Sequence, residues 1–171
     1  MSLNYSSFEI PFKDVDKLLM HVLPFNSCQV MWKYECFSLE RFKESLMYAE
    51  EWELYSRVLM NKNSGVSINK TLFYGRKHPN SNSGEFFKGN SVRIDSNVES
   101  IKLVVANLKK NGLLNLELKK YFIRVSIAFQ EYNLKKDLIA LYEDNTFNYE
   151  LYYFKINIKN RLYKLKRRIL K

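Results

Sequence analysis

The sequence is poor in the residues from which most recognisable catalytic and metal sites are built. It has five Gly, two Cys and two His in 171 residues. The glycines form no phosphate-binding loop, and the sequence contains neither C-x-x-C nor the paired-histidine pattern H-E-x-x-H. We therefore expect no cofactor and no metal ion, and we favour a non-enzymatic function.

Long apolar runs are also absent. No stretch approaches the roughly 20 residues that a helix needs to cross a membrane. The first ten residues, MSLNYSSFEI, have neither the basic start nor the apolar segment of an export signal. We therefore expect an intracellular protein, in the cytoplasm or an organelle matrix, with no membrane span.

Cysteine is too scarce for a disulfide framework. Cys28 and Cys36 lie in a stretch that alternates apolar and polar residues, CQVMWKYECF, and this alternation predicts a strand. An intact strand would hold the two thiols about 27 Å apart at ~3.4 Å per residue. That separation is too large for a disulfide, so we expect two free thiols.

The abundant residues indicate a folded protein from a compositionally biased genome. Hydrophobic residues make up 46% and charged residues 27% of the chain, which is ordinary for a globular domain. The length predicts one domain, residues 1–171, with a core of its own. Lys, Asn, Ile, Tyr and Phe have A/T-rich codons, so a phage, mobile element or A/T-rich genome would favour them without selection for binding.

Hydrophobic periodicity predicts an α+β fold, a single domain with a mixed, mostly antiparallel sheet and about five helices. Apolar residues recur at helical spacing in some segments and alternate in others. We expect helices at about 13–23, 39–60, 95–110 and 134–143, and a basic C-terminal helix at 157–171. We expect strands at 28–37, 66–75, 85–94, 121–129 and 146–156.

The clearest local pattern belongs to the helix after Ile94. Ser96 and Glu99 match the S-x-x-E capping box, and Gly112 follows the last turn. The apolar residues of one helix face lie between them, at Val98, Ile101, Val104, Val105 and Leu108. We expect the helix to be capped by Ser96 and to end before Gly112.

The positive charge is concentrated in two blocks. The net charge is +10, yet residues 1–60 are net −3 and residues 137–150 are net −4. Residues 61–136 carry +9, and residues 151–171 carry +8 with no acid among them. Codon bias would distribute Lys evenly, so the two basic blocks predict an anionic partner.

The second block ends the chain in NIKNRLYKLKRRILK. On a helix its apolar residues form one narrow stripe, which we expect to pack on the core: Ile158, Leu162, Leu165 and Ile169. The cations then face outward, and we assign them to nucleic-acid binding: Lys159, Arg161, Lys164, Lys166, Arg167, Arg168 and Lys171. A merely solvated helix end is one alternative. An acidic membrane surface is another, which a narrow stripe without Trp or Phe disfavours.

The first block contains a polar loop, GRKHPNSNSG, between two predicted strands. Five basic side chains in and after this loop could extend the binding surface: Arg76, Lys77, His78, Lys88 and Arg93. Tyr74, Phe86 and Phe87 lie between them. This mixture suits RNA or single-stranded DNA, because bases stack on rings while cations hold phosphates. An ordinary hairpin with core aromatic residues is the alternative interpretation.

Three functions follow, in order of preference. The first is a basic protein that binds nucleic acid, RNA or a ribonucleoprotein surface, through its phosphates. The second is an inhibitor of an acidic or nuclease partner, an immunity or anti-defence protein with Trp52 and Tyr55 as aromatic anchors. The third is a metal-dependent nuclease that would hold Mg²⁺ with the carboxylates of Glu85, Asp95 and Glu99, with Lys102 nearby.

Overall fold

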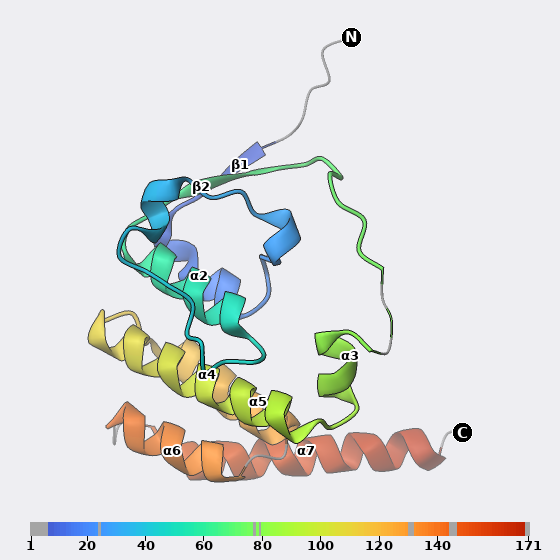
Figure 1. Cartoon of the computed structure of the whole chain (residues 1–171). Helices are drawn as coiled ribbons and strands as arrows, with labels where there is room; N and C mark the ends of the chain where they lie inside the picture. Colours follow the sequence, from blue (N-terminus) through green and yellow to red (C-terminus); the bar gives the residue numbers. More distant parts are fainter. Residues whose placement is uncertain are drawn as a thin grey trace. The chain divides into compact units, whose positions relative to one another are not determined.

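The computed structural model describes residues 7–23, 25–76, 78, 80–129, 132–143 and 147–169. At Arg161 and 164–169 it describes the backbone alone. The chain divides into two compact units, Met1–Asn111 and Gly112–Lys171, whose elements are labelled in Figure 1. The single domain over 1–171 stays a prediction.

The protein is mostly helical, and the predicted α+β fold with a mixed sheet is wrong. In the described part of the chain there are seven helices, a helical content of 61% and one small sheet of two strands. The strands β1 (Ser7–Ile10) and β2 (Gly65–Ile68) pair antiparallel, with Ser7 opposite Ile68 and Ile10 opposite Gly65. The described residues thus contain this two-stranded ribbon in place of the larger sheet that the sequence predicts.

The first unit joins the ribbon to helices of different lengths. Beside β1 and β2 its elements are, in chain order, η1 (Phe12–Asp14), α1 (Val15–Leu19), η2 (Ser27–Gln29), η3 (Tyr34–Phe37), α2 (Glu50–Met60), α3 (Asn82–Phe87) and α4 (Ser91–Lys110). The η elements are short 3-10 helices. η1 and α1 together replace the predicted helix 13–23, so that helix ends earlier than expected.

The core of the first unit lies where α2 packs on α1 and α4. Leu54 and Val58 of α2 are fully buried there. α4 buries residues at helical spacing on one face, which confirms the predicted apolar face: Ile101, Val104, Val105 and Leu108. The predicted end of α4 is also confirmed, because Gly112 follows it with a φ of 67°, a left-handed conformation that favours glycine.

The predicted capping box of α4 is wrong. The helix begins at Ser91, and the side-chain oxygen of Asn90 accepts a hydrogen bond from Arg93 N at 3.2 Å. Ser96 lies inside the helix and holds the loop before α2. Its Oγ accepts from Met47 N at 2.8 Å and from Tyr48 N at 2.9 Å, and it donates to Tyr48 O at 2.8 Å. Ser96 of the predicted capping box therefore makes a tertiary contact and does not cap the helix.

The predicted strand at 85–94 spans the end of α3 and the start of α4. Ser81 caps α3 by accepting a hydrogen bond from Gly84 N at 3.0 Å. Phe86 is buried and stacks on Tyr48, with ring centroids 4.4 Å apart. The apolar residues of this segment are thus buried by a short helix. The other expected strand of this hairpin, 66–75, is regular only as far as Ile68.

Two further predictions around α2 are wrong. Residues 28–37 form no strand; Trp32 instead contacts the rings of Phe25, Phe37 and Tyr55, with centroids 4.9 to 6.2 Å apart. The predicted helix 39–60 begins only at Glu50, after a left-handed residue at Ala49 with a φ of 62°. Cys28 is exposed and Cys36 is half-buried, and the strand from which we argued that they do not pair with each other is absent.

The second unit contains three helices, α5 (Leu116–Ala128), α6 (Tyr132–Tyr142) and α7 (Tyr149–Ile169). α5 packs on both α6 and α7. Asn115 caps α5 by accepting a hydrogen bond from Leu118 N at 2.9 Å. α6 confirms the helix predicted at 134–143, and it buries Leu134 and Leu138.

The predicted strands at 121–129 and 146–156 are wrong. The first lies in α5, where the buried residues follow helical spacing: Leu118, Phe122, Ile123, Ser126 and Ile127. The second forms the start of α7, which continues without a break into the predicted C-terminal helix. Both segments are rich in Tyr, Phe and Ile, which favour strands in general, and packing against other helices overrides that preference here.

Candidate nucleic-acid interface

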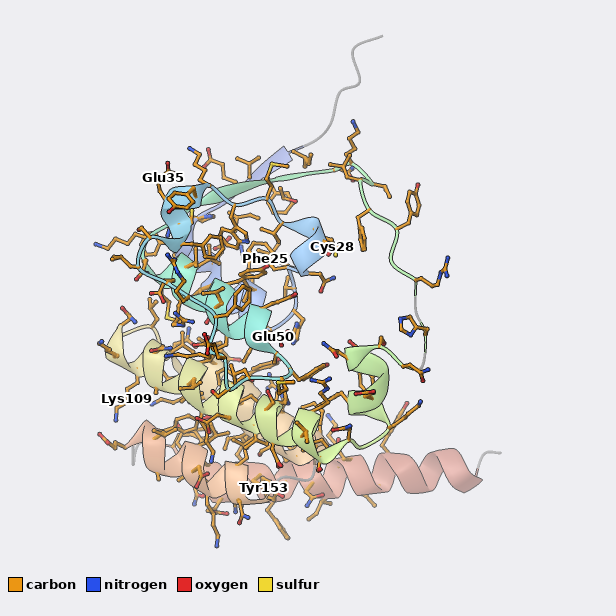
Figure 2. All side chains as sticks on the ribbon, viewed as in Figure 1. Phe25, Cys28, Glu35, Glu50, Lys109 and Tyr153 are labelled. Atoms are coloured by element: carbon orange, nitrogen blue, oxygen red, sulfur yellow. The ribbon has the colours of Figure 1, made fainter. Side chains whose placement is uncertain are left out.

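The inner side of α7 is aromatic and packs within the second unit. Tyr149 is buried, and Tyr152, Tyr153 and Ile156 are half-buried. The hydroxyl of Tyr152 is 2.9 Å from Arg124 Nη1, which donates to it from α5. Tyr153, labelled in Figure 2, lies with its ring centroid 4.7 Å from Lys135 Nζ of α6. These contacts hold the first half of α7 in place.

The outer side of α7 carries an exposed apolar stripe. Its four side chains are 41 to 61% exposed: Leu151, Phe154, Ile158 and Leu162. Ile158 comes nine residues after Tyr149, and at about 100° per residue the two lie on opposite sides of the helix. The expectation that Ile158 and Leu162 pack on the core is therefore wrong. The aromatic side of α7 takes that place.

The cations of α7 flank the stripe as far as the side chains are described. Lys155 and Lys159 are exposed on the outer surface. The backbone stays helical through Arg161, Lys164, Lys166, Arg167 and Arg168, whose side chains lie outside the described residues, as does all of Lys171. The acid of α7, Glu150, is in its first turn and pairs with Lys135 Nζ at 2.7 Å. From 151 onward the sequence supplies no further carboxylate.

The basic loop belongs to the first unit, whereas α7 belongs to the second. Residues 69–76 adopt neither helix nor strand, and Tyr74, Arg76 and His78 are exposed. The ring of Tyr74 is 87% exposed. Lys77 lies outside the described residues. The loop thus presents a ring and cations to solvent.

The residues after the loop are divided between surface and core. Lys88 is exposed at the end of α3, and Phe87 before it is exposed as well, whereas Phe86 is buried. Arg93 is engaged within the unit: Nη1 donates to Met47 O, and Nε lies 3.5 Å from Glu85 Oε2. Arg93 is therefore a structural side chain as well as a cation, and Phe86 is not available for stacking.

The two proposed protein anchors lie inside the first unit. Tyr55 is buried against Trp32, and burial raises the pKa of its hydroxyl. Trp52 is half-buried and donates from Nε1 to Leu19 O at 3.3 Å. Both rings thus stabilise the packing of α2 on neighbouring segments, and Tyr55 presents no surface to a partner.

The acidic residues considered for a nuclease do not gather into a metal site. Glu85 is in α3, and Asp95, Glu99 and Lys102 are in α4. In the described part of the chain no group of three or more His, Cys, Asp and Glu side chains is placed to hold a metal ion. The nuclease hypothesis has no structural support from these residues.

The structure also contains a buried ion-pair network that we did not predict from the sequence. The fully buried carboxylate of Glu53 accepts two hydrogen bonds from Arg57, at 2.7 Å from Nε and 2.8 Å from Nη2. Arg57 also donates to Glu40 and to Arg41 O. Burial raises the pKa of Glu53 to about 7, and the two bonds from Arg57 favour its ionised form in return. The i, i+4 spacing of Glu53 and Arg57 in the sequence could have indicated this ion pair.

A small polar cavity adjoins this network. It has a volume of about 140 Å³ and is lined by Glu40, Arg57, Met60, Asn61, Asn107, Lys110 and Asn111. The carboxylate of Glu40 is already bonded to Arg57 and, at 2.8 Å, to Asn61 Nδ2. The polar groups that line this cavity thus attach the loop at Glu40 to α2.

No helix in the described ranges is both long and apolar enough to cross a membrane. Models of known protein families, curated proteins and solved structures were compared with this chain, and none of them matches it. Its function must therefore be argued from its own residues.

Proposed function

We propose that the protein is a non-enzymatic, intracellular nucleic-acid-binding protein that holds RNA or single-stranded DNA through the cations of α7. One observation carries this proposal. α7 is a single helix over Tyr149–Ile169, and the chain from 151 to 171 has eight Lys and Arg and no acid.

The charge of this helix is costly without a polyanion. Like charges at i, i+3 and i, i+4 repel each other, and α7 has no acid beyond Glu150 with which they could pair. Cations near a helix C-terminus gain from its dipole, but three or four would satisfy that need. Phosphates of a nucleic acid relieve the repulsion and release counterions on binding.

The basic loop of the first unit is the second element of the proposal. Arg76 and His78 are exposed there, Lys77 lies between them in the sequence, and Tyr74 offers a ring on which a base can stack. We include Lys88 in this surface. Arg93 contributes charge from a side chain that is already bonded to Glu85 and Met47.

The alternative of a protein inhibitor loses one of its two expected aromatic anchors, because Tyr55 is in the core and only Trp52 is half-buried. Co-purification with one acidic protein at high salt would revive it, because apolar anchors are insensitive to salt whereas surface charges are screened.

The test is the salt dependence of binding to a labelled single-stranded oligonucleotide. For single strands the slope of log affinity against log salt is about −0.7 per phosphate contact. Arg167→Gln with Arg168→Gln should therefore flatten the slope by about 1.4 and weaken binding at low salt. The matched control removes two exposed cations from the first unit, Lys33→Gln with Lys62→Gln, and should change neither quantity. Absence of binding at low salt, or equal effects of the two double variants, would contradict the proposal.

A further inference from the structure

The apolar stripe of α7, Leu151, Phe154, Ile158 and Leu162, is a feature that nucleic-acid binding leaves unused. Phosphates held by the flanking cations give Leu151, Ile158 and Leu162 nothing apolar to contact. The sequence repeats the same spacing at Leu165 and Ile169, so the stripe has the period of the helix itself. Four large apolar side chains in one row on an exposed helix indicate a contact with something apolar.

We propose that α7 also binds the surface of anionic lipid membranes, lying in the plane of the interface with the stripe in the acyl boundary and its cations at the headgroups. This inference goes beyond nucleic-acid binding, because it depends on the apolar side chains of α7 as well as on its cations. The structure removes the objection that the stripe lacks Trp and Phe, because Phe154 belongs to it, and the core does not cover these side chains.

Contacts within the second unit fix the conformation of the first half of α7 before any membrane contact. Tyr149, Tyr152 and Ile156 are buried or half-buried on the side away from the stripe, and Tyr152 is bonded to Arg124 of α5. An amphipathic peptide that is unfolded in water must order itself on the membrane, and that ordering opposes binding. In α7 the helix and the direction of its stripe are set by the second unit.

The charges indicate which apolar surface fits. Lys155 and Lys159 are exposed on one flank of the stripe. Long cationic side chains beside an apolar row can keep their charges at the headgroups while their aliphatic stems stay in contact with lipid. Anionic headgroups attract such a segment electrostatically, and zwitterionic ones do not.

A second copy of the chain is a poorer occupant of the stripe. Residues 151–171 carry +8, and pairing two stripes would bring two such segments together. Like charges across an interface oppose association.

Flotation of the full chain with lipid vesicles tests the inference. We expect binding to vesicles that contain phosphatidylglycerol and at least tenfold weaker binding to pure phosphatidylcholine vesicles. Phe154→Ser, Ile158→Ser and Leu162→Ser together should lower binding to the anionic vesicles at least tenfold. Affinity for the single-stranded oligonucleotide should stay within about twofold, because that binding depends on the cations.

The matched control changes apolar side chains that are exposed elsewhere and that the nucleic-acid proposal does not use. Leu72→Ser with Phe73→Ser alters the loop of the first unit and should leave vesicle binding unchanged. A second readout uses Phe154→Trp, whose added fluorescence should be quenched by lipids with brominated acyl chains. No binding to anionic vesicles, equal binding to both lipids, or binding that survives the triple stripe variant would overturn the inference. If oligonucleotide affinity fell as far as vesicle affinity, the stripe would serve the helix and not a membrane, and the inference would again fail.

The two proposals fail in different ways. Loss of vesicle binding with intact oligonucleotide binding leaves nucleic-acid binding standing and removes the membrane contact. The reverse result removes the nucleic acid and leaves the membrane as the partner of α7. Salt should weaken both contacts, but vesicle binding should fall less steeply, because burial of the stripe persists when charges are screened.

Discussion

Ser96 binds the loop before α2 to α4 through one hydroxyl with three hydrogen bonds. Ser96→Ala leaves the N–H groups of Met47 and Tyr48 without this partner in a partly buried place. We expect the free energy of unfolding to fall by about 2 kcal/mol. Ser100 is the matched control, since it is also buried in α4 and its Oγ donates only to Asn97 O of the same helix. Ser100→Ala should cost ~0.5 kcal/mol or less in urea titrations. Equal losses for the two variants would contradict the role given to Ser96.

Glu53 and Arg57 make stability depend on pH more strongly once the pair is broken. Burial already raises the pKa of Glu53 from 4.5 to about 7, and Arg57→Met, which removes the cation bonded to this carboxyl, should raise that pKa further. A carboxyl whose folded pKa is raised stabilises the fold below its unfolded pKa and loses that effect as pH rises through the folded value. We therefore expect Arg57→Met to cost about 3 kcal/mol at pH 8 and clearly less at pH 5.

The matched control for this pH dependence is Glu53→Gln with Arg57→Met, which has no carboxyl to titrate at that position. Its unfolding free energy, compared with that of the unsubstituted protein, should show no additional loss between pH 5 and pH 8. A single variant Arg57→Met that lost the same free energy at both pH values would show that Glu53 is not confined as the structure has it.

At the scale of elements, Lys135 ties α6 to α7. Its side chain is 2% exposed and bonds both oxygens of Glu150, at 2.7 and 3.0 Å, whereas Glu150 is 64% exposed. Glu150→Gln leaves a buried cation without its carboxylate, and we expect a loss of about 1 kcal/mol, limited by the access of water to Glu150. Adding Lys135→Met should recover most of that loss, as measured by thermal unfolding. A double variant less stable than Glu150→Gln would refute this account.

Periodicity failed for the elements in which short aromatic stretches fit two periods at once. Tyr121, Ile123, Val125 and Ile127 alternate, yet they lie on α5, whose buried set includes Leu118 and Phe122. The residues that cap the helices in the structure would have been a better guide to where the helices begin. Ser81, Asn90 and Asn115 each accept a hydrogen bond from the backbone N–H three residues on, and each stands before a helix that the sequence analysis did not place correctly.

At the scale of the whole molecule, the charge is divided unequally between the two units. Gly112–Lys171 holds thirteen Lys and Arg against six Asp and Glu, so it carries +7 of the net +10. Its α7 provides most of that excess and an apolar stripe on its outer side. Charge of one sign on a small unit steers anionic partners toward it and makes association fall with salt. Both proposals for this protein therefore depend on the second unit.

The sequence by itself determined the charge of the C-terminal segment, its helical spacing and the buried face and end of α4. These depend on residue order along one element, which periodicity and capping describe well. It predicted the wrong side of α7 as the one that packs on the protein, and only the tertiary structure decided which side does. Tyr149, Tyr152 and Ile156 compete with the Leu and Ile stripe for the same neighbours, and the outcome depends on the surface that α5 offers. A pattern within one helix contains no information about that surface.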